Sequence, residues 1–172
     1  MVGCDPSSAK LTFYAIHLPT GTVKTHVANI GKGKWTPGNC ERAMYVAWEA
    51  IEMFDPMRRD GTAAWFYIEE PVVGRGGFRS TMVQSFVSGP VQACFSQANY
   101  NIELVNNSTW KAWLGVAGKR TESGKKKIHI DRAMQARFPK DHNVVNGDDD
   151  LLDAAAIARY GEHRRRRRTR LA

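Results

Sequence analysis

Four acidic residues in this chain could act together, because each stands at the edge of an expected strand or on the face of an expected helix. Asp5 closes a short apolar run, and Glu69 ends an aromatic, strand-like run. Asp150 and Asp153 lie three residues apart at the start of an alanine-rich helical stretch. Carboxylates that are brought together are costly unless a cation neutralises them. Oxygen-only ligands of this kind suit hard cations such as Mg²⁺ or Mn²⁺.

A carboxylate set of this kind matches phosphodiester hydrolysis with bound divalent metal ions. Two ions about 3.5–4 Å apart clamp the attacking and leaving oxygens, so the site needs neither a histidine nor a nucleophilic serine. The five histidines of the chain form no common motif. The residues therefore predict cleavage of nucleic acid with bound metal. The glycines within residues 115–121 lack the spacing of a phosphate-binding loop, so we expect no nucleotide cofactor.

Length and charge predict one globular domain with a basic extension. At 172 residues the chain fits a single domain with a full core. The formal net charge is +8, but six arginines within residues 164–172 supply most of it and leave about +2 for residues 1–163. We expect a nuclease domain over residues 1–163 and a disordered polybasic tail over residues 164–172, which adds salt-sensitive affinity for nucleic acid.

Cysteine usage and hydropathy indicate an intracellular protein. The three cysteines are widely spaced and carry no metal-ligand pattern, which is typical of reduced thiols. No apolar run approaches the length of a membrane span, so we expect no membrane partner.

The order of expected elements predicts an α/β fold. Residues 1–5, 10–18 and 21–30 are rich in β-branched or aromatic residues and are separated by turn sequences, which indicates an antiparallel meander. Two further strands are expected over residues 63–69 and 102–105. Antiparallel strands followed by alternating helices and strands predict a mixed five-stranded sheet with helices on both faces.

Helical spacing of apolar residues predicts four helices. They span residues 37–55, 78–99, 125–138 and 149–163. The pair Gly89-Pro90 should kink or split the second of them. Residues 139–149 are expected to form a polar loop.

Three blocks of sequence carry a resemblance to a known family. They are Gly3-Cys4-Asp5-Pro6-Ser7-Ser8, Ile68-Glu69-Glu70-Pro71 and the segment from Asp150 to Ala158. In this order they resemble the RuvC-type Holliday junction resolvases of the RNase H-like (retroviral integrase) superfamily, particularly the phage-encoded ones. The last block is similar to the family's Asp-x-x-Asp-Ala-x-Ala-Ile-Ala. The chain departs from the pattern at Cys4, where the family has an aliphatic residue, at Ser7, where it has glycine, and in its arginine tail.

The resemblance implies an activity and a site. Asp5, Glu69, Asp150 and Asp153 take the catalytic, metal-binding positions, with two Mg²⁺ ions for which Mn²⁺ can substitute. The implied enzyme is a crossover junction endodeoxyribonuclease. It would be a homodimer that resolves four-way or branched DNA by paired symmetric nicks, leaving 5′-phosphate and 3′-hydroxyl ends. The apolar helix over residues 78–99 is the candidate dimer interface. The expected location is the cytoplasm of a bacterium or of a phage-infected host cell.

The acids also have structural interpretations. Asp5 precedes Pro-Ser and could form a turn. Glu70 could replace Glu69 as the ligand, although alternation along a strand lets only one of them face the site, and the family match favours Glu69. Asp148 and Asp149 suit a helix N-terminus, whereas Asp153 lies inside the helix and is explained less well by capping.

Basic residues in the chain are candidates for phosphate contacts. Lys119, Lys125 and Lys126 surround a Gly/Ser turn before an expected helix, where they oppose the helix dipole. With Lys111, they match a stretch whose basic residues contact scissile-strand phosphates in the resembled family.

Residues after the second acidic strand are candidates for DNA binding as well. Arg75, Phe78 and Arg79 lie in or beside the glycine-rich run at residues 71–77. Glycines let a backbone approach DNA, and an exposed aromatic can stack on an unpaired base. A core role for Phe78 is equally open.

Three rival functions remain at this stage. One is an RNase H-like nuclease acting on other substrates, such as an RNA–DNA hybrid or a flap. Another is a non-catalytic nucleic-acid-binding module whose acids are caps. The third is a polybasic partner-binding protein that uses only residues 164–172.

Overall fold

The computed structural model describes residues 1–7, 9–31, 36–58, 63–71, 77–118, 128–145 and 147–171, excluding the side chains of residues 77–80 and 171. The elements are β1 (Val2–Pro6), β2 (Lys10–His17), β3 (Thr22–Asn29), α1 (Pro37–Phe54), η1 (Asp55–Met57), β4 (Ala64–Glu69), α2 (Gly77–Gln97), β5 (Tyr100–Val105), α3 (Asn107–Leu114), α4 (Ile128–Arg137), α5 (Pro139–Val145) and α6 (Asp149–Leu171).

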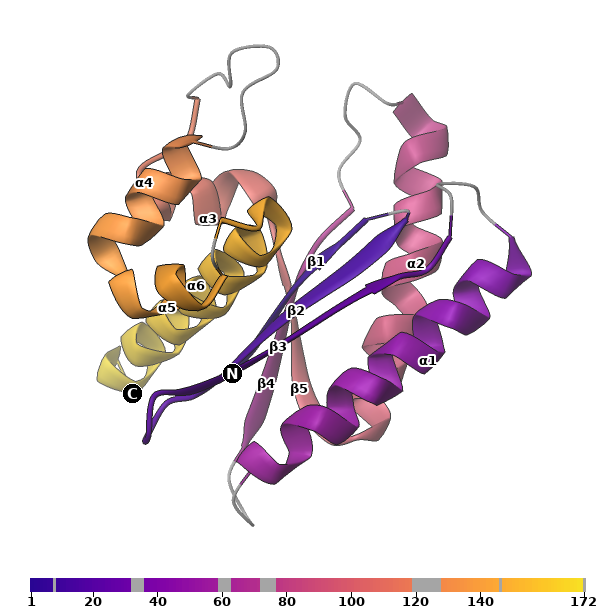
Figure 1. The fold of residues 1–172 in the computed structure, drawn as a ribbon, viewed down its shortest axis with the longest axis horizontal. Helices are drawn as coiled ribbons and strands as arrows, with labels where there is room; N and C mark the ends of the chain where they lie inside the picture. Colours follow the sequence, from indigo (N-terminus) through magenta and orange to yellow (C-terminus); the bar gives the residue numbers. More distant parts are fainter. Residues whose placement is uncertain are drawn as a thin grey trace.

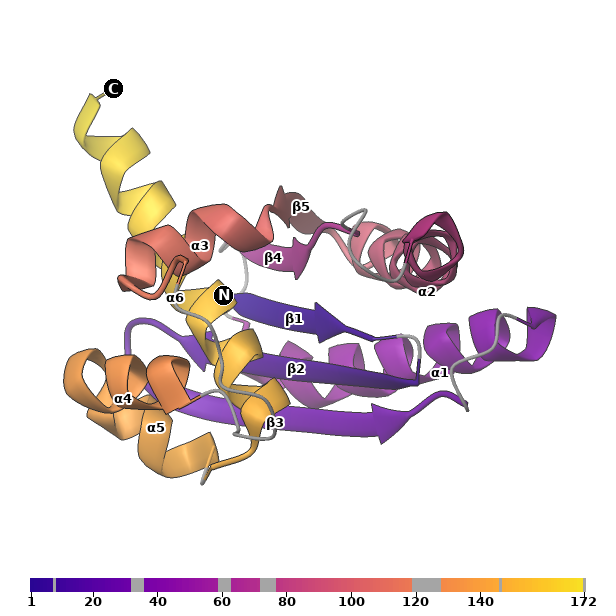
Figure 2. The ribbon, with the colours of Figure 1, turned by 90° about the horizontal axis from the view of Figure 1, so that it is seen from above.

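The five strands form one mixed sheet in the order β3-β2-β1-β4-β5. β1 pairs antiparallel with β2, and β2 pairs antiparallel with β3, so the predicted meander is confirmed. β4 runs parallel to β1, and β5 runs parallel to β4. The central strand β1 and its neighbour β4 therefore end at the same edge of the sheet (Figure 2). Asp5 of β1 and Glu69 of β4 lie at these strand ends.

Helices cover both faces of the sheet, as predicted. α1 and α2 lie on one face, and α6 with α3, α4 and α5 lies on the other (Figure 1). Because strand residues alternate between faces, Cys4 belongs to the core under α1 and α2, whereas Tyr67 belongs to the core under α6. In the first core the rings of Phe66 and Phe95 stack with centroids 3.9 Å apart. None of the helices in the described ranges is both long and apolar enough to span a lipid bilayer.

Two expected helix starts carry side-chain caps. α1 begins after Thr36, whose side chain accepts a hydrogen bond from the Asn39 N–H at 3.2 Å. α6 begins after Asp148, whose Oδ1 accepts from the N–H groups of Asp150 and Leu151, each at 3.0 Å. The capping interpretation is therefore confirmed for Asp148.

The helix α2 is not split at Pro90, contrary to one of our two expectations. It runs as a single helix with Pro90 inside it. Proline has no N–H to donate to the carbonyl four residues earlier, which here is Phe86. The Cys40 thiol of α1 donates to that carbonyl at 3.4 Å. Gly89 also lacks the Cβ atom that would meet the proline ring.

The expectation of a polar loop over residues 139–149 is also wrong, because residues Pro139–Val145 form the helix α5. Asp141 is buried within it and pairs with Arg159 of α6 through Nη2–Oδ1 at 2.8 Å and Nε–Oδ2 at 2.5 Å. A buried, bidentate ion pair ties this short helix to α6. The polar composition of the segment predicted a loop. The ion pair could not be predicted from the segment itself, because its partner lies in another element.

The arginine tail is helical instead of disordered. Residues 164–171 continue α6 to Leu171. Glu103 of β5 pairs with both Arg164 and Arg168 and so holds the helix end against the sheet. The polybasic composition of the segment predicted disorder, because its partner carboxylate lies more than sixty residues away in the sequence.

β1 and α6 come into backbone contact at Gly3. A Cβ atom added to Gly3 would lie 2.1 Å from the Ala154 carbonyl oxygen and 2.6 Å from the Ala158 nitrogen. Farther along the helix, a Cβ atom on Gly161 would lie 2.4 Å from the Tyr67 ring. One glycine on each partner therefore lets the helix lie directly on the sheet.

Replacing Gly3 with alanine should lower the free energy of unfolding by about 1–3 kcal/mol, because the new methyl group meets helix backbone that cannot rotate away. Urea denaturation measures this change. Gly38→Ala is the control, since its added Cβ atom would find only the Thr36 hydroxyl, at 3.8 Å. That variant should be neutral or stabilising by about 0.5–1 kcal/mol. Equal stabilities of the two variants would contradict the close helix–strand contact.

Candidate active site

Asp5 and Glu69 occupy neighbouring positions at the carboxyl ends of β1 and β4. The register pairs Cys4 with Ile68, so these acids are the next pair along two parallel strands. Cys4 and Ile68 point into the core under α1 and α2, so the acids face the layer that holds α6. Burial raises the pKa of the Cys4 thiol well above its ordinary value, and the negative charges of Asp5 and Glu69 raise it further.

Glu69 is held by two donors from α3. Its Oε1 accepts from Asn107 Nδ2 at 2.5 Å, and its Oε2 accepts from the Trp110 indole N–H at 3.0 Å. Trp110 is fully buried, so its donor is fixed in position. Because both carboxylate oxygens are engaged, the orientation of Glu69 is set by the protein.

Glu70 turns to different neighbours. Its Oε1 accepts from Asn106 Nδ2 at 2.5 Å. Both glutamates, together with Pro6, Pro71 and Gln84 of α2, line a small hollow at the end of the sheet. Glu69 is therefore the glutamate at the strand position beside Asp5, and its role as a ligand stays a prediction.

The first turn of α6 brings Asp150 and Asp153 to the same end of β1. The helix rests on Gly3 immediately after these acids. Asp150 forms an ion pair with Lys10, the first residue of β2, which begins beside the end of β1. Asp153 is only 5% exposed. Acids from two strands and one helix thus lie around one edge of the sheet.

Lys10 is a positive charge that the chain itself supplies among these acids. Its hydrogen bond to Asp150 raises the pKa of Lys10 above its ordinary value. Partial burial acts in the opposite direction, and the charges of Asp150, Asp148 and Asp5 raise the pKa further. The ammonium therefore lies within the electrostatic field of acids from both β1 and the start of α6.

The four predicted ligands fit a hard divalent cation in the chemistry of their donors, because all are carboxylates. Within the ranges that the structure describes, no three His, Cys, Asp or Glu side chains already converge closely enough to hold a metal ion. One of the four carboxylates, Asp150, is paired with Lys10 instead. The acids therefore have the donor type that Mg²⁺ prefers, and they lie at a common end of the sheet.

Lys111 lies close to this group of acids. Its Nζ is 5.0 Å from the centroid of the Trp110 ring, the tryptophan that holds Glu69. Several other predicted DNA-binding residues lie outside the described residues: Arg75, Lys119, Lys125 and Lys126, together with the side chains of Phe78 and Arg79.

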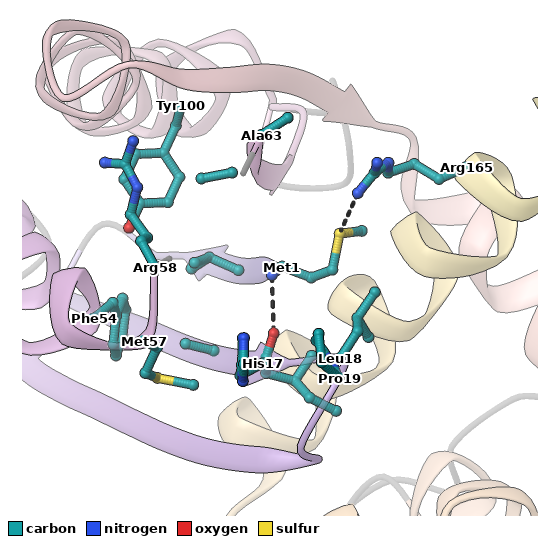
Figure 3. A pocket seen from close by; sticks show the side chains of 14 residues that line it. Met1, His17, Leu18, Pro19, Phe54, Met57, Arg58, Ala63, Tyr100 and Arg165 are labelled. Carbon is teal, nitrogen blue, oxygen red and sulfur yellow. Dashed lines mark hydrogen bonds between the residues drawn. The ribbon is translucent and has the colours of Figure 1, made fainter. Parts of the chain in front are cut away.

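A pocket of about 360 Å³ lies at the opposite end of β1 (Figure 3). Its arginines already have partners. Arg58 packs over the Tyr100 ring at 4.8 Å from the centroid, and Arg165 donates to the Met1 sulfur at 3.7 Å. Its described lining contains no carboxylate, so it offers no ligand set for a hard cation.

Sequence reasoning missed the residues that hold Glu69. Asn107 and Trp110 lie in a segment from which no regular helix was expected. The available signal was Asn106 followed by Asn-Ser-Thr, which is typical of a helix N-cap. Asn106 indeed caps α3, with its Oδ1 accepting from the Ser108 N–H at 3.0 Å.

The topology defines the class of fold. An antiparallel meander, two further strands parallel to its first strand, and helices on both faces make up the RNase H-like fold. Two solved structures share this arrangement. "Thermus thermophilus RuvC structure" matches with a TM-score of 0.60 and 17% identity, covering 92% of this chain and 91% of that chain. "T. thermophilus RuvC in complex with Holliday junction substrate" matches with a TM-score of 0.62 and 15% identity, covering 92% and 90%.

No known protein family and no curated protein matches the sequence. At the identities found among the solved structures, the likeness establishes that the chain has the RuvC fold.

Replacing Trp110 with phenylalanine should lower the free energy of unfolding by about 1–3 kcal/mol, because Glu69 loses a donor and a cavity forms. Chemical denaturation measures the loss. Trp48→Phe on the exposed surface of α1 is the matched control and should change stability by about 0.5 kcal/mol or less. If both variants unfold alike, the indole does not anchor Glu69.

Proposed function

We propose that this chain is a divalent-metal-dependent endonuclease that resolves four-way DNA junctions by paired nicks, leaving 5′-phosphate and 3′-hydroxyl ends. The observation that carries the proposal is the adjacency of Asp5 and Glu69 at one edge of the sheet, with Asp150 and Asp153 brought over that edge by α6. The substrate class is supported by the RuvC fold, since one solved structure with this fold is a complex with a Holliday junction.

In this proposal the residues of the chain have different roles. Asp5, Glu69, Asp150 and Asp153 would hold Mg²⁺ or Mn²⁺, which neutralises phosphate charge and activates water when bound. Glu69 enters the site already oriented, because Asn107 and Trp110 fix both of its oxygens. Such prior positioning removes the cost of ordering that side chain when substrate arrives.

Two lysines supply positive charge for the substrate strand. Lys10 lies beside the acids, because it pairs with Asp150. Lys111 projects from α3 beside Trp110. Their ammonium groups on either side of the sheet edge attract a phosphate to the acids, which alone would repel it.

The first test compares cleavage of a synthetic four-way junction and a matched linear duplex, in Mg²⁺ and in EDTA. Wild type should nick the junction symmetrically in Mg²⁺ only. Asp153→Asn should lose about 100-fold or more of this activity, because it removes a carboxylate charge from the site, while junction binding measured by gel shift persists.

Other outcomes of this experiment separate the rivals. Equal cutting of both substrates, or preferential cutting of an RNA–DNA hybrid or a flap, would support a nuclease of the same fold with a different substrate. Tight binding without cleavage in any metal would support a non-catalytic binding module and overturn the proposal.

The proposal includes a homodimer formed through α2. Val83 and Val87 of this helix are buried in the core, whereas Met82 and Phe86, one turn apart, are 40% and 37% exposed. The apolar surface of α2 is therefore divided between the core and the outside. A two-fold interface on this stripe gives two active sites, as paired symmetric nicks require.

Phe86→Glu should convert the dimer to a monomer in light scattering after size exclusion, because it puts a charge into the apolar stripe. Paired nicking should then become single and uncoordinated. Val144→Glu, an exposed position on α5 in the other layer, is the control and should leave the dimer intact. A wild-type chain that is monomeric at the concentrations used for cleavage would contradict the interface.

A further inference from the structure

A groove of about 500 Å³ lies between α3 and the C-terminal half of α6, whose end extends past α3 (Figure 2). Thr109 and Trp113 of α3 form one wall. The residues of the other wall recur every three or four positions along α6, so they share one face of that helix. They are Tyr160, His163, Arg164, Arg167 and Arg168.

The part of the groove next to α3 is lined by aromatic rings. The Trp113 ring centroid lies 5.7 Å from the ring centroids of both Tyr160 and His163. Phe138 stacks on Trp113 at 5.8 Å, and the Arg137 guanidinium lies 4.4 Å from the Trp113 centroid. This packing fixes Trp113 in place, so it gives the groove a rigid aromatic wall.

The rim of the groove is cationic. Arg164 and Arg168 share a single carboxylate, Glu103. Among the side chains that the structure describes, no carboxylate pairs with Arg167. Three guanidiniums therefore face one carboxylate, and the groove has an excess of positive charge.

This combination of charge and aromatic surface fits one class of ligand. Guanidinium groups bind phosphate through paired hydrogen bonds. A cationic groove beside aromatic rings is the arrangement by which proteins bind single-stranded nucleic acid without sequence preference. The groove, of about 500 Å³, has room for nucleotide units. An acidic peptide would satisfy the arginines but would leave the aromatic wall unused.

We propose that the groove between α3 and α6 binds a single-stranded segment of nucleic acid, with phosphates on Arg164, Arg167 and Arg168 and a base against Trp113. The groove is separate from the acids. From Asp153 to Arg164 and Arg168 the helix rises about 17 and 23 Å. In this proposal the groove thus binds the nucleic-acid strand at a distance from the proposed cleavage point.

Two neighbouring arginines provide a matched test. Arg167 lines the groove, whereas Arg166 pairs with Glu162 on another face of α6 and is 71% exposed. Binding of a fluorescein-labelled oligothymidylate of about 8–12 nucleotides is followed by anisotropy in EDTA. Arg167→Ala should weaken binding about fivefold or more and lower the slope of log affinity against log salt by about 1. Arg166→Ala should change affinity by about twofold or less.

The competing ligands complete the experiment. A duplex with the same number of phosphates and a polyglutamate peptide of the same charge should both bind more weakly than the single strand. Equal losses in the two arginine variants would overturn the proposal, as would tighter binding of the duplex or of the peptide. The assay requires neither metal nor cleavage, so its failure and the failure of the proposed nuclease activity are read from different experiments.

Discussion

The backbone contact between α6 and β1 at Gly3 determines how close the two layers come and where the acids lie. On the helix side the contact is made by small residues, since Ala154, Ala155 and Ala158 are fully buried. A helix with an alanine face on a glycine strand position can approach more closely than one that presents leucines. The depth and direction of α6 then follow, and with them the positions of Asp150 and Asp153 relative to the strand acids.

Three of the acidic side chains at this end of the sheet are stabilised by different parts of the chain. Glu69 accepts from two α3 donors, Asp148 accepts from the N–H groups of the α6 start, and Asp150 pairs with Lys10. These separate partners compensate the repulsion among the acids in the folded chain.

The sequence predicted what depends on local pattern and missed what depends on distant partners. Periodicity and turn residues were sufficient for the meander, for the start of α1 and for the alternation of helices and strands. The family blocks named Asp5, Glu69, Asp150 and Asp153 as candidates, and their role as ligands stays a prediction. By contrast, α5 pairs with Arg159, the end of α6 pairs with Glu103, and the unsplit α2 accepts a hydrogen bond from Cys40, and all three partners lie far away in the sequence. Asn107 and Trp110 were missed for the same reason, since their importance appears only once α3 lies beside β4.

The length of α6 has a mechanical consequence. It is one helix from Asp149 to Leu171, about 35 Å long, and it rests on the sheet through the two glycine contacts at Gly3 and Gly161. Its first turn carries acids, and its last turns carry arginines. The Glu103 pairs and the Asp141–Arg159 pair hold the same helix at further points. The acids near its start and the arginines near its end are therefore kept at a fixed spacing along one rigid element.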